Sequence, residues 1–155
     1  MSVAPQTPTV DSTAAKGGHV EVVPVHYDDL DAMGIVHNAR YAVLLERALN
    51  AFWTPLGYTF DGGVFSQPDA FLAVAEFSIV YRAPFRGTGK VNVHFWIDRL
   101  SETSAVYGFR MVSGDGATMH AEGRRVQIRL DQETMRPTAW SPPCREILQA
   151  LQRGE

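Results

Sequence analysis

The stretch Asp29-Leu30-Asp31-Ala32-Met33-Gly34-Ile35-Val36-His37-Asn38-Ala39-Arg40-Tyr41 decides the fold, because an apolar run follows it directly and ends near Trp53. The apolar residues of that run recur at the spacing of one helix face: Tyr41, Leu44, Leu45, Ala48 and Phe52. Asn38 is a residue type that commonly caps a helix N-terminus, and Pro55 and Gly57 end the helix. A helix this apolar needs cover on more than one side.

Composition is that of an ordinary globular chain. Its 155 residues can bury a core large enough to fold without disulfide or metal cross-links. The net charge of -3 does not suggest that the protein binds nucleic acids or membrane surfaces. The single cysteine, Cys144, excludes an intrachain disulfide and fits a reducing compartment. Residues 1–18 lack the apolar core of a signal peptide, so we expect a flexible N-terminal tail, one domain over residues 19–155 and a cytoplasmic protein.

Apolar and alternating segments predict one strand before the acidic loop and four after the helix. The expected strands are His19 to His26, Phe71 to Tyr81, Val91 to Asp98, Ser104 to Val112 and Thr118 to Leu130. The connections after the helix are too short for crossovers, so the sheet must be largely antiparallel. The apolar surface of a single helix and the apolar face of a single sheet are buried when the two pack together, which predicts an α+β fold with the sheet curled around the helix. The edges of such a sheet favour a homo-oligomer.

Acidic and histidine side chains gather within a dozen residues of the loop: His26, Asp28, Asp29, Asp31 and His37. A calcium loop started at Asp29 would place Met33 at the third ligand position, and a zinc site lacks a close pair of His or Cys ligands, so we expect no metal. In a second interpretation Asp28 and Asp29 are solvated loop residues, and Asp31 caps the turn before Gly34.

The third interpretation of the loop is catalytic and depends on Asp31, seven residues before Asn38. The first amides of a helix are unpaired donors at the positive end of its dipole, so a carbonyl oxygen docked there would be polarised. Asp31 could then attack the carbonyl carbon or activate a water against it. Acyl transfer and acyl hydrolysis both require this arrangement.

The motif Asp-x-Asp-Ala-x-Gly-Ile-Val-x-Asn-x-x-Tyr over residues 29–41, followed by Glu46 in the helix, resembles the hot-dog-fold acyl-CoA thioesterases of the 4-hydroxybenzoyl-CoA thioesterase type. Tyr81-Arg82-Ala83-Pro84 and Ala121-Glu122-Gly123 resemble weaker motifs of the same family. The resemblance covers about residues 20–140. It implies a hot-dog fold, in which a five- or six-stranded antiparallel sheet wraps a long central helix, assembled as homodimers or homotetramers.

This resemblance makes Asp31 the catalytic carboxylate and the backbone amide of Asn38 the donor to the thioester oxygen. It leaves open whether His37 assists, orients a water or only packs. Glu46 is expected to be the structural partner of an arginine. The expected substrate-binding residues are Gly34 and Tyr41 of the motif, together with basic residues that could meet the phosphates of CoA, namely Arg82, Arg86 and Arg124. Lys90 and Arg125 are further basic candidates of the same kind.

The sequence therefore predicts an acyl-CoA thioesterase that releases a carboxylate and a free thiol, with no cofactor, since coenzyme A belongs to the substrate. An acyl-carrier-protein substrate and a non-catalytic acyl-CoA-binding module remain alternatives. A hot-dog dehydratase is disfavoured because no His-Phe-Pro-Gly motif is present. Cys144 lies far in sequence from the histidines and is discounted as a nucleophile. The acyl group, the nucleophilic or general-base role of Asp31, and the choice between dimer and tetramer stay open.

Overall fold

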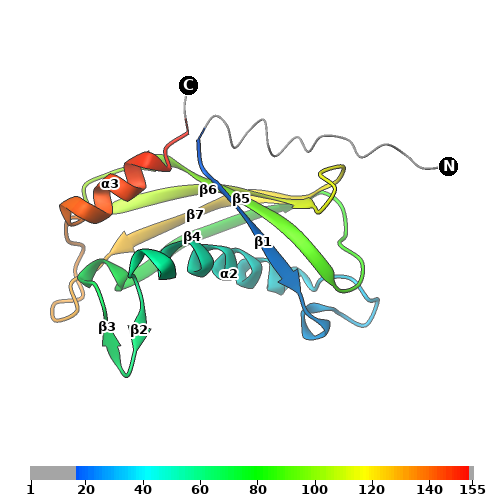
Figure 1. The fold of residues 1–155 in the computed structure, drawn as a ribbon, viewed down its shortest axis with the longest axis horizontal. Helices are drawn as coiled ribbons and strands as arrows, with labels where there is room; N and C mark the ends of the chain where they lie inside the picture. The colour runs from blue at the N-terminus through cyan, green and yellow to red at the C-terminus, as the bar shows by residue number, and fades with distance from the viewer. Residues whose placement is uncertain (1–16, 154–155) are drawn as a thin grey trace.

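The computed structural model describes residues 17–153, in which an antiparallel sheet curves around one long helix (Figure 1). The sheet has five strands: β1 (His19–Val25), β4 (Leu72–Tyr81), β5 (Gly89–Leu100), β6 (Ser104–Ser113) and β7 (Met119–Arg129). Their spatial order is β1-β5-β6-β7-β4, and every neighbouring pair is antiparallel. The predicted α+β fold is confirmed. The predicted tail over residues 1–18 lies almost wholly outside the described residues.

Helix α2 (Tyr41–Trp53) lies along the concave face of the sheet (Figure 1). Leu44, Leu45 and Ala48 are at most 1% exposed, as the helical spacing predicts. They join one core with the inward residues of the central strands, such as Phe95 and Phe109, which are fully buried. Burial of this helix face against the sheet therefore supplies the main hydrophobic stabilisation of the fold.

The start of α2 differs from the prediction that Asn38 caps it. A 3-10 turn over Asn38–Arg40 precedes the α-helix, and His37 is the capping residue. The Nδ1 atom of His37 accepts a hydrogen bond from the backbone N–H of Ala39 at 3.0 Å. The prediction for Asn38 was wrong because the ring nitrogen of the preceding residue already satisfies an amide of that first turn.

Two smaller elements flank the ends of the helix and sheet. The connection after α2 contains a short hairpin of β2 (Phe60–Asp61) and β3 (Val64–Phe65). Near the C-terminus, α3 (Pro142–Ala150) buries Cys144 and Leu148. No helix within residues 17–153 is long and apolar enough to cross a membrane.

Candidate active site

An open cleft of about 360 Å³ lies between the acidic loop, the start of α2 and the end of β4. Four of the predicted site residues line it together: Asp31, Asn38, Tyr41 and Arg82. They come from three separate elements, and Tyr81 of β4 adds a fifth side chain. The structure thus brings the predicted carboxylate and the predicted amide donor to one concave surface.

Asp31 is fixed by the tight turn that it begins. Its Oδ1 atom accepts hydrogen bonds from the backbone N–H groups of Met33 at 2.8 Å and Ile35 at 3.4 Å. Gly34 completes the turn with a left-handed φ of 74°, which favours glycine. The Oδ2 atom of Asp31 has no hydrogen-bond partner among residues 17–153. One carboxylate oxygen therefore holds the loop while the other is free to act in the cleft.

Asn38 lines the same cleft. Its carbonyl oxygen accepts a hydrogen bond from the Tyr81 hydroxyl at 2.8 Å, which ties the end of β4 to the start of the helix. Its N–H is the first of the 3-10 turn and has no acceptor in the described part of the chain. Because this amide lies at the positive end of the helix dipole, it can stabilise negative charge on a bound oxygen.

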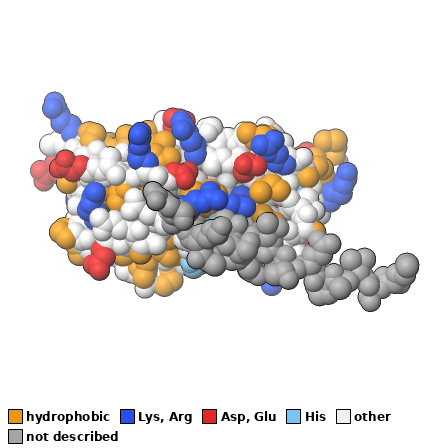
Figure 2. Space-filling model, turned by 90° about the horizontal axis from the view of Figure 1, so that it is seen from above, with side chains coloured by type: hydrophobic (Ala, Val, Ile, Leu, Met, Phe, Trp, Pro, Cys, Tyr) orange, Lys and Arg blue, Asp and Glu red, His pale blue; other side chains and the backbone are white. Residues whose placement is uncertain are grey.

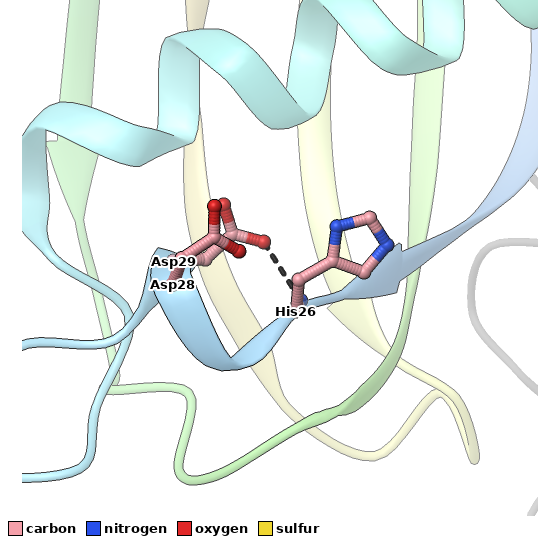
Figure 3. Close-up of side chains that lie close together, drawn as sticks. All are labelled: His26, Asp28 and Asp29. Carbon is pink, nitrogen blue, oxygen red and sulfur yellow. Dashed lines mark hydrogen bonds between the residues drawn. The ribbon is translucent and has the colours of Figure 1, made fainter.

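Asp29 holds the acidic loop against α2 through its side chain. Its side chain is fully buried, so the interpretation of Asp29 as a solvated loop residue was wrong. Arg47 donates to its two oxygens at 2.7 and 3.1 Å, and Arg40 donates to Oδ1 at 3.0 Å. The remaining bond to Oδ2 comes from the backbone N–H of His26 at 2.7 Å (Figure 3). Burial would raise the pKa of Asp29, but these bonds outweigh it and lower the pKa to about 2.

His26, Asp28 and Asp29 also form the one cluster of possible metal ligands in residues 17–153, with their ligand atoms within 4.8 Å of one another. Figure 3 shows both carboxylates close together beside the histidine ring. The Asp29 oxygens already accept from two guanidinium groups and a backbone amide. A cation would have to displace these donors, so the cluster is better described as an ion-pair network.

Other predicted site residues lie outside the lining of the cleft. His37 is an exposed cap, and Gly34 makes the turn and accepts from the backbone N–H of Gly87 at 2.8 Å. Arg86 meets the loop through its backbone, in a bridge to Ile35. Arg124 pairs with Glu76 at 2.6 Å on the outer face of the sheet, where opposite charges are interspersed (Figure 2). The structure does not bring Arg86 and Arg124 to the lining of the Asp31 cleft.

Arg125 and Glu46 form an ion pair, which confirms the prediction that Glu46 is the partner of an arginine. Arg125 itself was a candidate for an exposed CoA-binding rim, but its side chain is only 7% exposed and faces the interior. Sequence reasoning also did not select Tyr81 as a site residue. The only signal for Tyr81 was its place at the head of Tyr81-Arg82-Ala83-Pro84.

A protein-family model described as thioesterase-like superfamily matches residues 25–150. The chain belongs to the thioesterase-like superfamily. This thioesterase is 26% identical over 117 residues to the Acyl-CoA thioester hydrolase YbgC of Escherichia coli O157:H7, a match that covers 76% of this chain and 85% of YbgC. Its membership makes the chain a thioester hydrolase.

Solved structures place the thioesterase in the same fold. The PA5185 protein of Pseudomonas aeruginosa superposes with a TM-score of 0.76 at 23% identity, covering 91% of this chain and 96% of that one. Slr0204, a 1,4-dihydroxy-2-naphthoyl-CoA thioesterase from Synechocystis, gives a TM-score of 0.74 at 15% identity, covering 87% and 98%. The hot-dog fold implied by the sequence resemblance is confirmed.

Proposed function

We propose that this thioesterase hydrolyses acyl-CoA thioesters, with Asp31 as nucleophile or general base and the Asn38 amide as donor to the carbonyl oxygen. The observation that carries the proposal is that Asp31 and Asn38 line one cleft, and that the Asp31 Oδ2 atom and the Asn38 N–H have no partner among residues 17–153. The similarity to YbgC, which is named as an acyl-CoA thioester hydrolase, supports the CoA thioester as substrate.

In the general-base route, a water bound to Asp31 attacks the thioester carbon and gives its proton to the carboxylate. The developing oxyanion is stabilised by the Asn38 amide. The carbon–sulfur bond then breaks, and the thiolate takes up the proton to leave as free CoA, while the acyl group leaves as a carboxylate. In the nucleophilic route Asp31 attacks the carbon itself and the carbon–sulfur bond breaks, so the thiolate leaves and takes up a proton as free CoA; water then hydrolyses the acyl-enzyme anhydride to the product carboxylate and free Asp31. Both routes use the Asp31 side chain and the Asn38 backbone amide, and we propose that neither needs a further cofactor.

Arg82 is the proposed contact for the phosphates of CoA. It lines the cleft, and its side chain is 53% exposed. Its partner Glu122, at 3.1 Å, is similarly exposed, so the pair is weak and solvent-screened. A phosphate at the mouth of the cleft can therefore compete for the guanidinium, which binds phosphate oxygens in a bidentate manner.

Cys144 has no part in the proposed reaction. It is 3% exposed, and burial raises the pKa of its thiol to about 12, so the thiol stays protonated at neutral pH. A thiol in this form is a poor nucleophile. The single cysteine of the sequence fits a reducing compartment, and we propose that the enzyme acts in the cytoplasm.

We expect thiol release from a panel of acyl-CoA substrates, because the cleft supplies both a base and a carbonyl donor. The measurement is continuous capture of the free thiol by a chromogenic disulfide, with the protein omitted as control. Tight binding of acyl-CoA without any thiol release would instead support a non-catalytic binding module. Hydrolysis confined to acyl-carrier-protein thioesters would assign the cleft to that substrate class.

We also propose that the chain forms a homodimer through β4. This strand is at the edge of the sheet, and no other described strand pairs with the backbone N–H and C=O groups on its outer side. Four of its apolar side chains are 39–51% exposed: Leu72, Val74, Val80 and Tyr81. A long edge strand with apolar side chains is a template for pairing, and the two-fold symmetry of most homodimers would pair β4 with its own copy.

A Val80→Lys variant is expected to weaken this dimer, because a lysine on an edge strand opposes strand pairing. Sedimentation should give twice the 17.1 kDa chain mass for the wild type and a shift toward one chain mass for the variant at micromolar concentration. Val22→Lys, at a 57% exposed position on the opposite edge strand, is the matched control. A monomeric wild type, or dissociation by Val22→Lys alone, would contradict the proposal.

A further inference from the structure

A second cavity, of about 280 Å³, lies at the other end of α2 from the Asp31 cleft. It is enclosed by the last turns of the helix, the start of β4, the inner face of β7 and helix α3. Glu46 is the first helix residue of the cavity lining and follows Tyr41 of the cleft lining by five residues, or about 8 Å of helix, and the two linings share no residue. Within one chain, therefore, the second cavity does not belong to the proposed catalytic cleft.

Polar side chains stand in this cavity where the fold would be expected to place apolar ones. Arg125 and Gln127 of β7 face the same side of the sheet as Tyr107 and Ala105 of β6, their register partners in the core. They are only 6% and 7% exposed, and both line the cavity. Burying such groups is costly unless they are hydrogen-bonded, so their presence on the core side needs an explanation.

Neither side chain is fully satisfied by the protein. The side-chain amide of Gln127 makes no hydrogen bond to any of residues 17–153. Arg125 donates through one terminal nitrogen to Glu46, whereas its Nε atom is buried without a partner in the described chain. The Arg125 Nε atom is itself inaccessible, so the group that a polar atom entering the cavity would meet is the Gln127 amide, which can both donate and accept, beside the Arg125 guanidinium.

The surrounding charges favour an uncharged ligand group. Glu46 already neutralises Arg125, and the cavity also holds Asp69. The Asp69 carboxylate is occupied by the Ser141 hydroxyl at 2.6 Å and lies 3.7 Å from the Arg129 guanidinium. A ligand carboxylate would therefore face two carboxylates without an unpaired cation to balance it. A hydroxyl meets this surface better, because it can accept from Arg125 or Gln127 and donate to the Gln127 or Glu46 oxygen.

We infer that this cavity binds the far end of the acyl group and selects acyl chains that carry a hydroxyl there over plain hydrocarbon chains. The inference rests on the proposed thioesterase function and deepens it by naming the substrate class. An apolar cavity of about 150 Å³ accommodates the six carbon atoms of benzene, so the 280 Å³ here has room for about eleven carbon atoms. Trp53, Leu49 and Leu148 supply apolar walls for the chain that precedes the hydroxyl.

The β4 edge gives the route by which one acyl group can reach both sites. Leu72 and Val74, at the start of β4, line the cavity, whereas Tyr81, at the end of the strand, lines the Asp31 cleft. Antiparallel pairing of β4 with its own copy places the start of one strand beside the end of the other. A thioester held at one Asp31 would then extend its acyl chain into the cavity of the partner subunit.

The test compares acyl-CoA pairs of equal length, from hexanoyl-CoA to dodecanoyl-CoA, each with and without a terminal hydroxyl, together with the corresponding terminal carboxylates. The two readouts are kcat/KM from thiol release and the Kd for the Asp31→Asn enzyme from calorimetry. At the best-fitting length, the hydroxylated member should be favoured about tenfold to a hundredfold in both readouts, because the plain chain leaves buried polar groups unpaired.

Gln127→Met isolates the contribution of the amide, since methionine has a similar shape and removes an unsatisfied polar group. The variant should reduce the hydroxyl preference at least fivefold, mainly through faster hydrolysis of plain chains. Gln132→Met, at an exposed position after β7, is the matched control and should keep the wild-type preference. Thermal melting of each variant confirms that it is folded.

Equal or better hydrolysis of plain chains at every length would overturn the inference and leave the proposed function standing. Preference for the terminal carboxylate, or a hydroxyl preference that survives Gln127→Met, would also overturn it. A hydroxyl preference in Kd without thiol release from any substrate would support this cavity assignment and overturn the proposed function.

Discussion

Asp31→Asn is expected to lower kcat for acyl-CoA hydrolysis about a hundredfold to ten-thousandfold, the range typical of a positioned base or nucleophile. The amide keeps the Oδ1 acceptor that bonds the Met33 and Ile35 N–H groups, so the turn should persist. What the variant loses is the negative charge and basicity of the free Oδ2 atom. The measurement is steady-state thiol release with the best acyl-CoA of the panel.

Asp28→Asn is the matched control for this variant. Its carboxylate is in the same loop, but it is 77% exposed and lies 4.0 Å from Arg40, so it contributes little to the structure. It should retain at least half of the wild-type kcat. An Asp31→Asn enzyme with a third or more of the wild-type kcat would remove Asp31 from the mechanism.

Asp29→Asn is expected to lower the free energy of unfolding at pH 7 by about 2–3 kcal/mol, because it removes the buried counter-charge of Arg40 and Arg47, which are themselves partly exposed. In a chain of this length that corresponds to a fall in Tm of roughly 10 °C. Thermal or urea unfolding of the variant and the wild type measures the difference. A change below about 1 kcal/mol would show that the network does not stabilise the loop against the helix.

The stability difference between the wild type and Asp29→Asn depends on pH in a defined way. The pKa of Asp29 is about 2 in the folded protein, below its ordinary 3.8, so the folded state favours the charged carboxylate. Its stabilising contribution is therefore complete above about pH 4 and is lost as the pH falls through 2. The stability difference between wild type and Asp29→Asn should narrow over this interval and stay constant between pH 5 and 7.

The sequence predicted the fold well because its signals are local. The helical spacing of Leu44, Leu45 and Ala48 and the alternation of Val91, Val93 and Phe95 each specify an element and its buried face. Short connections after the helix then left an antiparallel sheet as the solution. The loop-to-helix motif also placed Asp31 and Asn38 in one cleft, as the seven-residue spacing suggested.

The errors concern properties that depend on distant partners. Asp29 was assigned to solvent because its two arginines are 11 and 18 residues away, on a helix whose rotation the sequence does not specify. Arg124 and Arg125 are adjacent, and strand geometry requires that one faces out and the other in, but a one-residue change of register would exchange them. Only the pairing of Arg125 with Tyr107 shows which of the two enters the interior.

Tyr81 gives this architecture one more consequence. Its hydroxyl steadies the carbonyl of Asn38, while its ring is half exposed on the strand that we assign to assembly. A substitution of Tyr81 that changed the contact with a neighbouring subunit would also remove the hydrogen bond to the Asn38 carbonyl, next to the proposed N–H donor. In the proposed dimer, quaternary structure and turnover would thus be coupled through a single side chain, and selection on either property would constrain the other.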